Sequence, residues 1–206
     1  MYFKNTFFYL NISVKKTQEV KMIYLLRHGL DDERYIGGWS EVDLINEGKI
    51  QIYGAANFLN EQNFKINKIY TSDVKRAVTT ANIVAEKLHL EVIRNIDLRE
   101  LNKGDLNGLL KGEVIKKYPQ YLSDVTINTK YPNGESMKEF YERIRKYLPR
   151  LYELDNNLLV THRGVINMLY FILNDIDLDM NKEQFDVTHG SIHKLDIKEK
   201  KIERIY

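Results

Sequence analysis

The segment that decides the fold is Ile23-Tyr24-Leu25-Leu26-Arg27-His28-Gly29. Its first four residues form an uninterrupted apolar run of strand length, which indicates a strand that is buried on both faces. A helical pattern follows, with apolar residues at positions 52, 55, 56 and 59. A strand that leads into a helix is typical of a parallel α/β sheet, in which ligands bind beyond the carboxyl ends of the strands. The residues after Leu26 are therefore the first place to look for chemistry.

The same alternation of strands and helices continues along the chain. Further strands are predicted at residues 68–71, 158–160 and 192–198, and further helices at 74–88, at 137–151 and from just beyond Gly164. Pro149 is expected to kink or end the helix that contains it. The pattern predicts one α/β domain over residues 22–206, a three-layer sandwich with a largely parallel sheet and helices on both faces.

Two segments do not follow this alternation. Between Gly104 and Gly134 the periodicity weakens and tyrosines and prolines appear, which is typical of a small irregular cap. Residues 1–21 form an N-terminal leader to which we assign no role. Its aromatic stretch resembles the start of a secretory signal, but Lys15-Lys16 interrupts that stretch and no small-residue cleavage site follows. We therefore expect a cytoplasmic protein.

The composition excludes several classes of function. Lys and Arg total 31 against 29 Asp and Glu among 206 residues, so no overall basic field indicates nucleic acid or an anionic membrane as a partner. The absence of cysteine excludes thiol nucleophiles, disulfides and zinc-thiolate sites. No apolar run approaches the roughly 20 residues that span a bilayer. Any anion would therefore have to be bound by a local arrangement of side chains and not by the overall charge. The oligomeric state stays open, and a homodimer is one possibility.

Histidine and arginine side chains follow three of the predicted strands. The segments are Arg27-His28-Gly29, Thr71-Ser72-Asp73 with Arg76 one turn later, and Thr161-His162-Arg163-Gly164. A single histidine or arginine at a strand end is more often structural than catalytic. Together, however, they would meet at one edge of the sheet, where guanidinium groups bind phosphate oxygens in pairs and a neutral imidazole is a competent nucleophile. The sequence therefore predicts a phosphate site.

Several motifs also occur in a fixed order between about Met22 and Asp196. They are Leu25-Leu26-Arg27-His28-Gly29, Gly38-Trp39-Ser40, Leu44-Ile45-Asn46-Glu47-Gly48, Tyr70-Thr71-Ser72-Asp73-Val74-Lys75-Arg76-Ala77, Leu98-Arg99-Glu100-Leu101, Asn133-Gly134-Glu135-Ser136, Val160-Thr161-His162 and Gly190-Ser191-Ile192. In this order they resemble the histidine phosphatase superfamily, in its phosphoglycerate mutase-like branch.

The resemblance implies a role for five residues. His28 would take the phosphoryl group, Arg27, Arg76 and His162 would bind its oxygens, and Glu100 would donate the proton to the leaving group. His162 also belongs to the catalytic set, because it would spread the charge of the transition state. Phosphoryl transfer depends mainly on positioning and electrostatic stabilisation, so this set needs neither a metal nor another cofactor. The expected partner is a small phosphorylated metabolite.

Two departures from the family pattern follow the first motif. Leu30-Asp31 stands where a Glu-Thr or Gln-Thr pair is usual, and Arg34 replaces an asparagine that usually contacts the phosphate. Arg34 would either supply a cation for a second anionic group of the substrate or point to solvent. We include it among the candidate substrate-binding residues.

Three more residues complete the candidate substrate site. Arg163 stands where the family often has glycine, His189 where it often has asparagine, and Trp39 is expected near the pocket mouth. His189 and His193 do not predict a metal site, because four residues of a strand span roughly 13 Å.

Three functions remain open at this point. The first is phosphomonoester hydrolysis through a phosphohistidine on His28, with α-ribazole phosphate as one substrate that nothing in the residues selects. A phosphoglycerate mutase is less favoured, because the segment after Glu100 is short and lacks the extended basic stretch that the resemblance leads us to expect. A phospholigand-binding module without catalysis would not need the complete set of five residues.

Overall fold

The core of the protein is one six-stranded sheet with strand order β3-β2-β4-β1-β5-β6. The computed structural model describes residues 21–123, 125–181 and 183–206. The strands are β1 (Met22–Arg27), β2 (Ile69–Thr71), β3 (Val92–Arg94), β4 (Asn157–Thr161), β5 (Ile192–Asp196) and β6 (Lys201–Arg204). The first four strands of the sheet are parallel, whereas β5 runs antiparallel to β1 and β6 antiparallel to β5. The prediction of a largely parallel sheet is confirmed.

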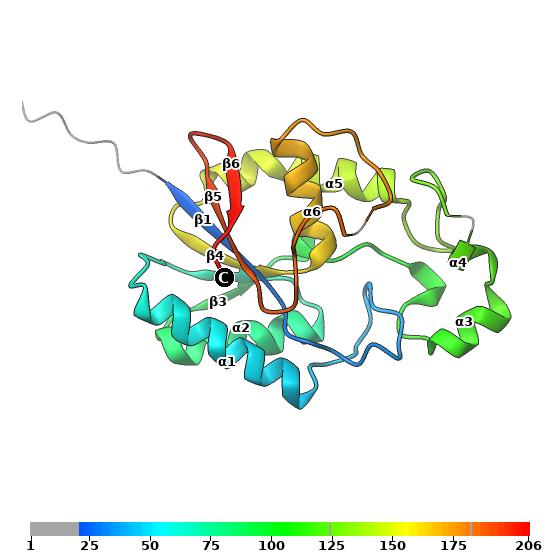
Figure 1. The fold of residues 1–206 in the computed structure, drawn as a ribbon, viewed down its shortest axis with the longest axis horizontal. Coiled ribbons are helices and arrows are strands. Elements are labelled where there is room, and N and C mark those ends of the chain that lie inside the picture. The colour runs from blue at the N-terminus through cyan, green and yellow to red at the C-terminus, as the bar shows by residue number, and fades with distance from the viewer. Residues whose placement is uncertain (1–20, 124, 182) are drawn as a thin grey trace, which may run out of the picture.

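Helices cover both faces of this sheet (Figure 1). Helices α1 (Asn46–Glu61) and α2 (Lys75–Leu88) lie on one face, and α5 (Met137–Glu153) and α6 (Arg163–Leu173) lie on the other. Successive residues of β1 belong to the two different core clusters: Tyr24 and Leu26 pack with α1 and α2, whereas Ile23 and Leu25 pack with α5 and α6. This arrangement explains why the first strand is apolar from Met22 to Leu26, and it confirms the three-layer sandwich.

The segment predicted as a cap lies beyond the carboxyl ends of the parallel strands (Figure 1). It contains the short helices η2 (Gly104–Leu106), α3 (Lys111–Lys117) and α4 (Gln120–Ser123), and it follows η1 (Ile96–Leu98). Its tyrosines pack together, because the rings of Tyr121 and Tyr131 stack at 5.2 Å and Tyr131 is buried in the main core. The predicted leader lies outside the described residues except for Lys21. Within the ranges that the structure describes, no helix is both long and apolar enough to cross a membrane.

Helix α5 does not end at Pro149, so only the kink remains of the two predicted effects of this proline. The helix begins with a reciprocal cap, in which Ser136 Oγ accepts from the backbone N–H of Glu139 and Glu139 accepts from that of Ser136. It continues through Pro149 to Glu153. The residues on both sides of the proline in its apolar stripe, Tyr147 and Leu151, are buried. Burial of this stripe outweighs the one hydrogen bond that proline cannot make.

Candidate active site

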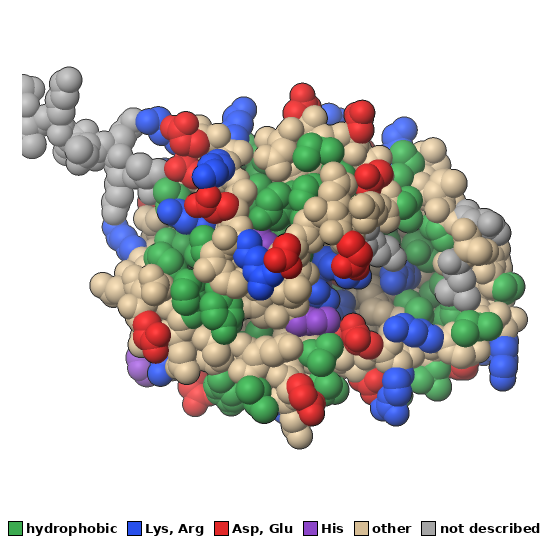
Figure 2. Space-filling model, in the orientation of Figure 1, with side chains coloured by type: hydrophobic (Ala, Val, Ile, Leu, Met, Phe, Trp, Pro, Cys, Tyr) green, Lys and Arg blue, Asp and Glu red, His purple; other side chains and the backbone are tan. Residues whose placement is uncertain are grey.

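A pocket of about 180 Å³ lies at the carboxyl ends of β1, β2 and β4. It is lined by His28, which follows β1, by Arg76 in the first turn of α2, and by Gly164 at the start of α6. Figure 2 shows basic and histidine side chains around a hollow near the middle of this face. The parallel topology therefore brings together residues that are more than a hundred positions apart in the sequence.

His28 is buried and has one defined tautomer. Its Nδ1 lies 2.8 Å from the carbonyl oxygen of Gly29. Because a carbonyl only accepts, Nδ1 carries the hydrogen and Nε2 keeps its lone pair. Burial lowers the pKa of His28 well below its usual value, and the charges of Arg76, His162 and Arg27 lower it further. The imidazole is thus neutral at physiological pH, as a nitrogen nucleophile must be.

Arg76 is fixed directly beside this nitrogen. Its side chain is 2% exposed, and its Nε donates to His28 Nε2 at 3.2 Å. The guanidinium also donates to the carbonyl oxygen of Gly38 at 2.8 Å and to Ser40 Oγ at 3.3 Å. These bonds hold a planar cation where the phosphoryl group would meet His28, and holding it in advance is what stabilises charge in a transition state.

Arg27 supplies a second buried cation. Its guanidinium donates to the carbonyl oxygen of Val187 at 2.8 Å and to His189 Nε2 at 2.6 Å. Its Nε is buried and has no hydrogen-bond partner among the described residues. Burial lowers the pKa of Arg27 to about 10, so the group stays charged at neutral pH. A buried donor of this kind is suited to an anionic ligand.

His162 lies on the other side of Arg76. It is fully buried, its Nδ1 accepts from Arg76 at 3.3 Å, and its Nε2 donates to Ser72 Oγ at 2.8 Å. Burial and the charge of Arg76 lower the pKa of His162. The rings of His28 and His162 are 5.2 Å apart, and His162 lies behind Arg76 and outside the set of residues that line the pocket.

Glu100 reaches the pocket from the segment that follows η1. Its Oε2 accepts from the backbone N–H of Gly164 at 3.0 Å, and its Oε1 accepts from that of Leu101 at 2.9 Å. A Cβ at position 164 would lie 2.0 Å from Glu100 Oε1, so the carboxyl group requires a glycine there. The carboxyl group is thus held at the start of α6, two residues after His162.

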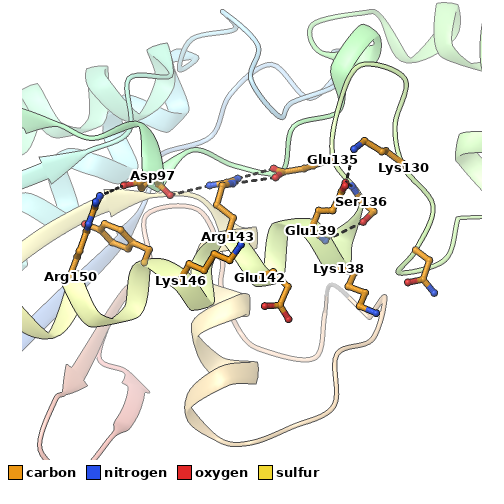
Figure 3. Close-up of a pocket in the computed structure, with 12 residues that line it drawn as sticks. Asp97, Lys130, Glu135, Ser136, Lys138, Glu139, Glu142, Arg143, Lys146 and Arg150 are labelled. Carbon is orange, nitrogen blue, oxygen red and sulfur yellow. Dashed lines mark hydrogen bonds and ion pairs between the residues drawn. The ribbon is translucent and has the colours of Figure 1, made fainter.

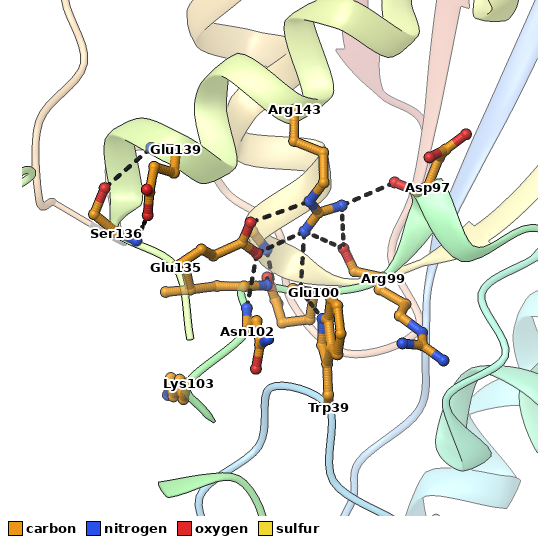
Figure 4. Close-up of polar contacts among 12 residues, drawn as sticks. Trp39, Asp97, Arg99, Glu100, Asn102, Lys103, Glu135, Ser136, Glu139 and Arg143 are labelled. Carbon is orange, nitrogen blue, oxygen red and sulfur yellow. Dashed lines mark hydrogen bonds and ion pairs between the residues drawn. The ribbon is translucent and has the colours of Figure 1, made fainter. Parts of the chain in front are cut away.

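Arg143 of α5 holds the segment that carries Glu100 (Figure 4). Its guanidinium donates to the carbonyl oxygens of Asp97, Arg99 and Glu100 at 3.0 to 3.2 Å. It also forms an ion pair with Glu135 at 2.8 Å. Sequence reasoning missed Arg143, although Glu135 belongs to one of the quoted motifs. The contact joins elements more than forty residues apart, and no local pattern reveals it.

The structure separates the four candidate substrate-binding residues into two groups. His189 and Arg163 line the pocket. Arg163 also pairs with Glu183 at 3.1 Å, which provides the anion that a cation at this helix N-terminus needs. Trp39 lies behind the site, where its indole N–H donates to the carbonyl oxygen of Glu100 at 2.6 Å.

Arg34 does not enter the pocket. Its side chain is 78% exposed and forms an ion pair with Asp32 at 2.5 Å. Because the acceptor lies only two residues earlier, the guanidinium is held on the outside of its own loop. Two alternatives were open for Arg34, a cation for the substrate or a side chain that points to solvent, and the structure shows the second. Two further cations line the pocket beside the arginines, Lys103 and Lys111, and sequence reasoning missed both.

The pocket fits an anion better than a metal ion. Among the described residues, His28, Asp31 and His189 offer ligand atoms within 4.8 Å of one another. However, Arg76 Nε faces both His28 and Asp31, and Arg27 donates to His189 Nε2. A cation among these atoms would be repelled by two buried guanidinium groups.

A larger hollow of about 830 Å³ lies along the outer side of α5 (Figure 3). Two pairs of its charged side chains form ion pairs with each other: Lys130 with Glu139 at 2.8 Å, and Arg150 with Asp97 at 3.1 Å. It contains no histidine. Volume alone therefore does not identify the active site, and the chemistry favours the smaller pocket.

Comparison with known proteins agrees with this fold. The family model described as histidine phosphatase superfamily (branch 1) matches residues 23–205. Phosphoglycerate mutase-like protein 4 of Arabidopsis thaliana is 36% identical over 159 residues, which cover 72% of this chain and 69% of that protein. The 2,3-bisphosphoglycerate-dependent phosphoglycerate mutase of Parabacteroides distasonis is 32% identical over 205 residues, covering 79% of this chain and 83% of that protein.

Solved structures show the same fold. The alpha-ribazole phosphatase of Shigella flexneri has a TM-score of 0.76 at 24% identity, covering 89% of this chain and 94% of that one. A mycobacterial glucosyl-3-phosphoglycerate phosphatase has a TM-score of 0.72 at 25% identity, covering 90% and 97%. The resemblance noted in the sequence is confirmed: the chain belongs to the histidine phosphatase superfamily, branch 1.

Proposed function

We propose that this chain hydrolyses small phosphomonoesters through a phosphohistidine formed on His28. The observation that carries the proposal is the tautomer of His28, whose Nδ1 donates to the Gly29 carbonyl oxygen and leaves Nε2 unprotonated beside Arg76. A neutral, oriented imidazole next to a buried guanidinium is suited to attack a phosphorus atom.

In the first step, Arg27, Arg76 and His162 bind the phosphoryl oxygens. His28 Nε2 forms a bond to phosphorus while the bond from phosphorus to the leaving oxygen breaks. The proton on Glu100 moves to that oxygen, so the product leaves as a neutral alcohol. Its position supports this role, because Glu100 lines the pocket and the backbone N–H of Gly164 at the start of α6 holds its carboxyl group.

In the second step, water attacks the phosphorus atom of the phosphohistidine. The Glu100 carboxylate takes a proton from the water as its oxygen bonds to phosphorus. The bond between phosphorus and Nε2 breaks, and its electron pair returns to His28. Inorganic phosphate leaves, and both His28 and Glu100 are restored to their starting states.

A phosphoglycerate mutase is the second candidate, since several relatives carry that name. The alignment with the Parabacteroides mutase is 205 positions long but covers only 79% of this 206-residue chain. Many of its positions are therefore gaps in this chain, and the mutase carries segments that have no counterpart here. Covering segments would be needed to keep the phosphohistidine from water. The short cap of this chain favours hydrolysis over return of the phosphoryl group to the substrate.

Phosphorus NMR distinguishes these functions. The protein is incubated in excess EDTA with 3-phosphoglycerate, α-ribazole phosphate or p-nitrophenyl phosphate, beside His28→Ala. Free phosphate that depends on His28 supports hydrolysis. Formation of 2-phosphoglycerate without free phosphate would assign a mutase. No turnover by the folded protein, with binding retained, would assign a binding module.

The role of Glu100 needs a matched comparison. Glu100→Gln removes the proton donor, whereas Glu113→Gln makes the same change on α3, outside the pocket. We expect Glu100→Gln to reduce turnover of alkyl phosphates by roughly 10²-fold or more and Glu113→Gln to leave it unchanged. Equal activity of the two variants would refute the acid role of Glu100.

A further inference from the structure

A carboxyl group, Asp31, lies inside the pocket that would bind the phosphoryl group. Its side chain is 13% exposed. One oxygen lies 3.5 Å from Arg76 Nε, and the other lies 3.8 Å from His189 Nε2. Arg76 Nε is also the donor to His28 Nε2. The same nitrogen therefore faces the proposed nucleophile and the Asp31 carboxyl group.

An ionised Asp31 would repel an anion in this position. The phosphoryl group must approach His28 Nε2 to react, and this brings it close to Asp31, because both are within 3.5 Å of Arg76 Nε. Two negative groups this close, in a buried site, destabilise each other unless one of them takes up a proton. Carboxyl groups that share a site resolve the conflict in this way, with one of the pair protonated.

Burial is the largest influence on Asp31 and raises its pKa, and charged groups act on it in both directions. Arg76 from α2 and Arg27 from β1 favour its ionised form, whereas Glu33 on the same loop favours its protonated form. His189, before β5, contributes no positive charge, because burial lowers its pKa to about 3. Burial of Asp31 itself raises its pKa. An anion that binds to Arg76 and Arg27 weakens the two influences that keep Asp31 ionised.

We propose that Asp31 binds the phosphoryl group in its protonated form, donating its carboxyl hydrogen to a phosphoryl oxygen, so that the protein takes up one proton at Asp31 as the anion binds. The proton comes from solvent, and no covalent bond of the ligand changes. The inference rests on the proposed function for the place of the anion. It adds a fourth phosphoryl ligand to Arg27, Arg76 and His162, and this ligand binds the anion only after it has taken up a proton.

Sulfate tests the proposal without chemistry, since it stays dianionic across the neutral range. Calorimetric titration in two buffers of different ionisation enthalpy counts the protons that are taken up with sulfate. We expect the wild-type protein to take up about one proton more than Asp31→Asn at pH 7 to 8. We also expect Asp31→Asn to bind sulfate at least tenfold more tightly than the wild type at pH 8, because its amide donates without a proton.

The neighbouring residue provides the matched control. Asp32 pairs with Arg34 outside the pocket, and hydrogen bonds from Arg34 lower its pKa to about 2. Asp32→Asn should therefore leave the proton count and the sulfate affinity unchanged. Asp31→Ser offers a second neutral donor if Asp31→Asn does not fold, and thermal unfolding checks both variants.

Each outcome bears on a different claim. Equal proton uptake by wild type and Asp31→Asn, with hydrolysis of phosphomonoesters retained, overturns the role of Asp31 and leaves the proposed function standing. The expected difference in proton uptake without any turnover supports Asp31 as an anion ligand and overturns the proposed hydrolysis. Failure of the wild type to bind sulfate overturns the placement of an anion beside Asp31.

Discussion

Replacing Arg143 by methionine removes the cation that holds the backbone around Glu100. The guanidinium donates to three carbonyl oxygens of residues 97–100 and pairs with Glu135. Methionine keeps an apolar stem beside Phe140, whose ring lies 4.9 Å from the guanidinium carbon. The variant therefore tests the charge and its hydrogen bonds more than the packing.

The loss of stability follows from the partial burial of this ion pair. Removing one partner of a fully buried pair costs about 3 to 5 kcal/mol. The side chains of Arg143 and Glu135 are 23% and 15% exposed, so water screens part of the charge that is left behind. We expect the free energy of unfolding to fall by roughly 2 to 3 kcal/mol.

The loss of activity should depend on the leaving group. Displacing a catalytic group by about 1 Å costs on the order of 10²-fold, and Glu100 is needed most where the leaving oxygen is a poor leaving group. For Arg143→Met we expect kcat/KM to fall by about 30- to 100-fold with an alkyl phosphate. With p-nitrophenyl phosphate, whose leaving oxygen needs no proton, only a few-fold loss is expected.

Urea unfolding and kcat/KM with glycerol phosphate and p-nitrophenyl phosphate measure both effects. Arg145→Met is the matched control, since Arg145 lies on the exposed side of α5 and pairs only with nearby Glu142 at 2.9 Å among the contacts described. Its unfolding free energy should change by about 0.5 kcal/mol or less. An equal loss with both substrates, or a stability no lower than that of the control, would refute the positioning of Glu100 by Arg143.

Three further predictions concern the packing of Gly29, the pH dependence of stability through His193, and the role of Arg34. In Gly29→Ala the new Cβ would lie 2.4 Å from the backbone oxygen of Gly48, so thermal unfolding should show a loss of about 1 to 3 kcal/mol, and an unchanged melting temperature would argue against this contact. Burial lowers the pKa of His193 to about 4. The neutral histidine therefore contributes its full stability above about pH 6.5, and the free energy of unfolding should fall by about 3 kcal/mol as the pH falls toward 4. The unfolding free energy of His193→Gln should depend less on pH in this window. Arg34→Ala should keep kcat/KM within about twofold, because Arg34 pairs with Asp32 outside the pocket, and a large loss would return Arg34 to the substrate site.

The sequence predicts well what the sheet topology itself determines. His28, Arg76 and His162 each follow a strand, and parallel strands place their carboxyl ends at one edge whatever the loops do. The helix positions 52, 55, 56 and 59 are buried for a similar reason, since a regular period leaves only one face available to the core. These predictions needed no knowledge of long-range contacts.

The remaining parts of the site depend on contacts that no local pattern contains. Arg34 faces solvent because it pairs with the nearby carboxylate of Asp32, and its distance from His28 in the sequence does not indicate which way its side chain points. Asp31 was visible as a departure from the family pattern, but its place beside Arg76 follows from the path of the loop. Arg143 reaches residues 97–100 only because α5 packs beside them.

The hydrogen bond from His28 to the neighbouring Gly29 carbonyl has a consequence for how this protein can diverge. The tautomer of the proposed nucleophile is set within two consecutive residues, whereas its charged surroundings come from separate segments such as α2, the start of α6 and the loop before β5. Substitutions in those segments can change which phosphate ester is accepted and at which pH, while the nitrogen that attacks keeps its chemical identity. Under the proposed function, the pocket can therefore come to accept other substrates while the attacking atom stays the same.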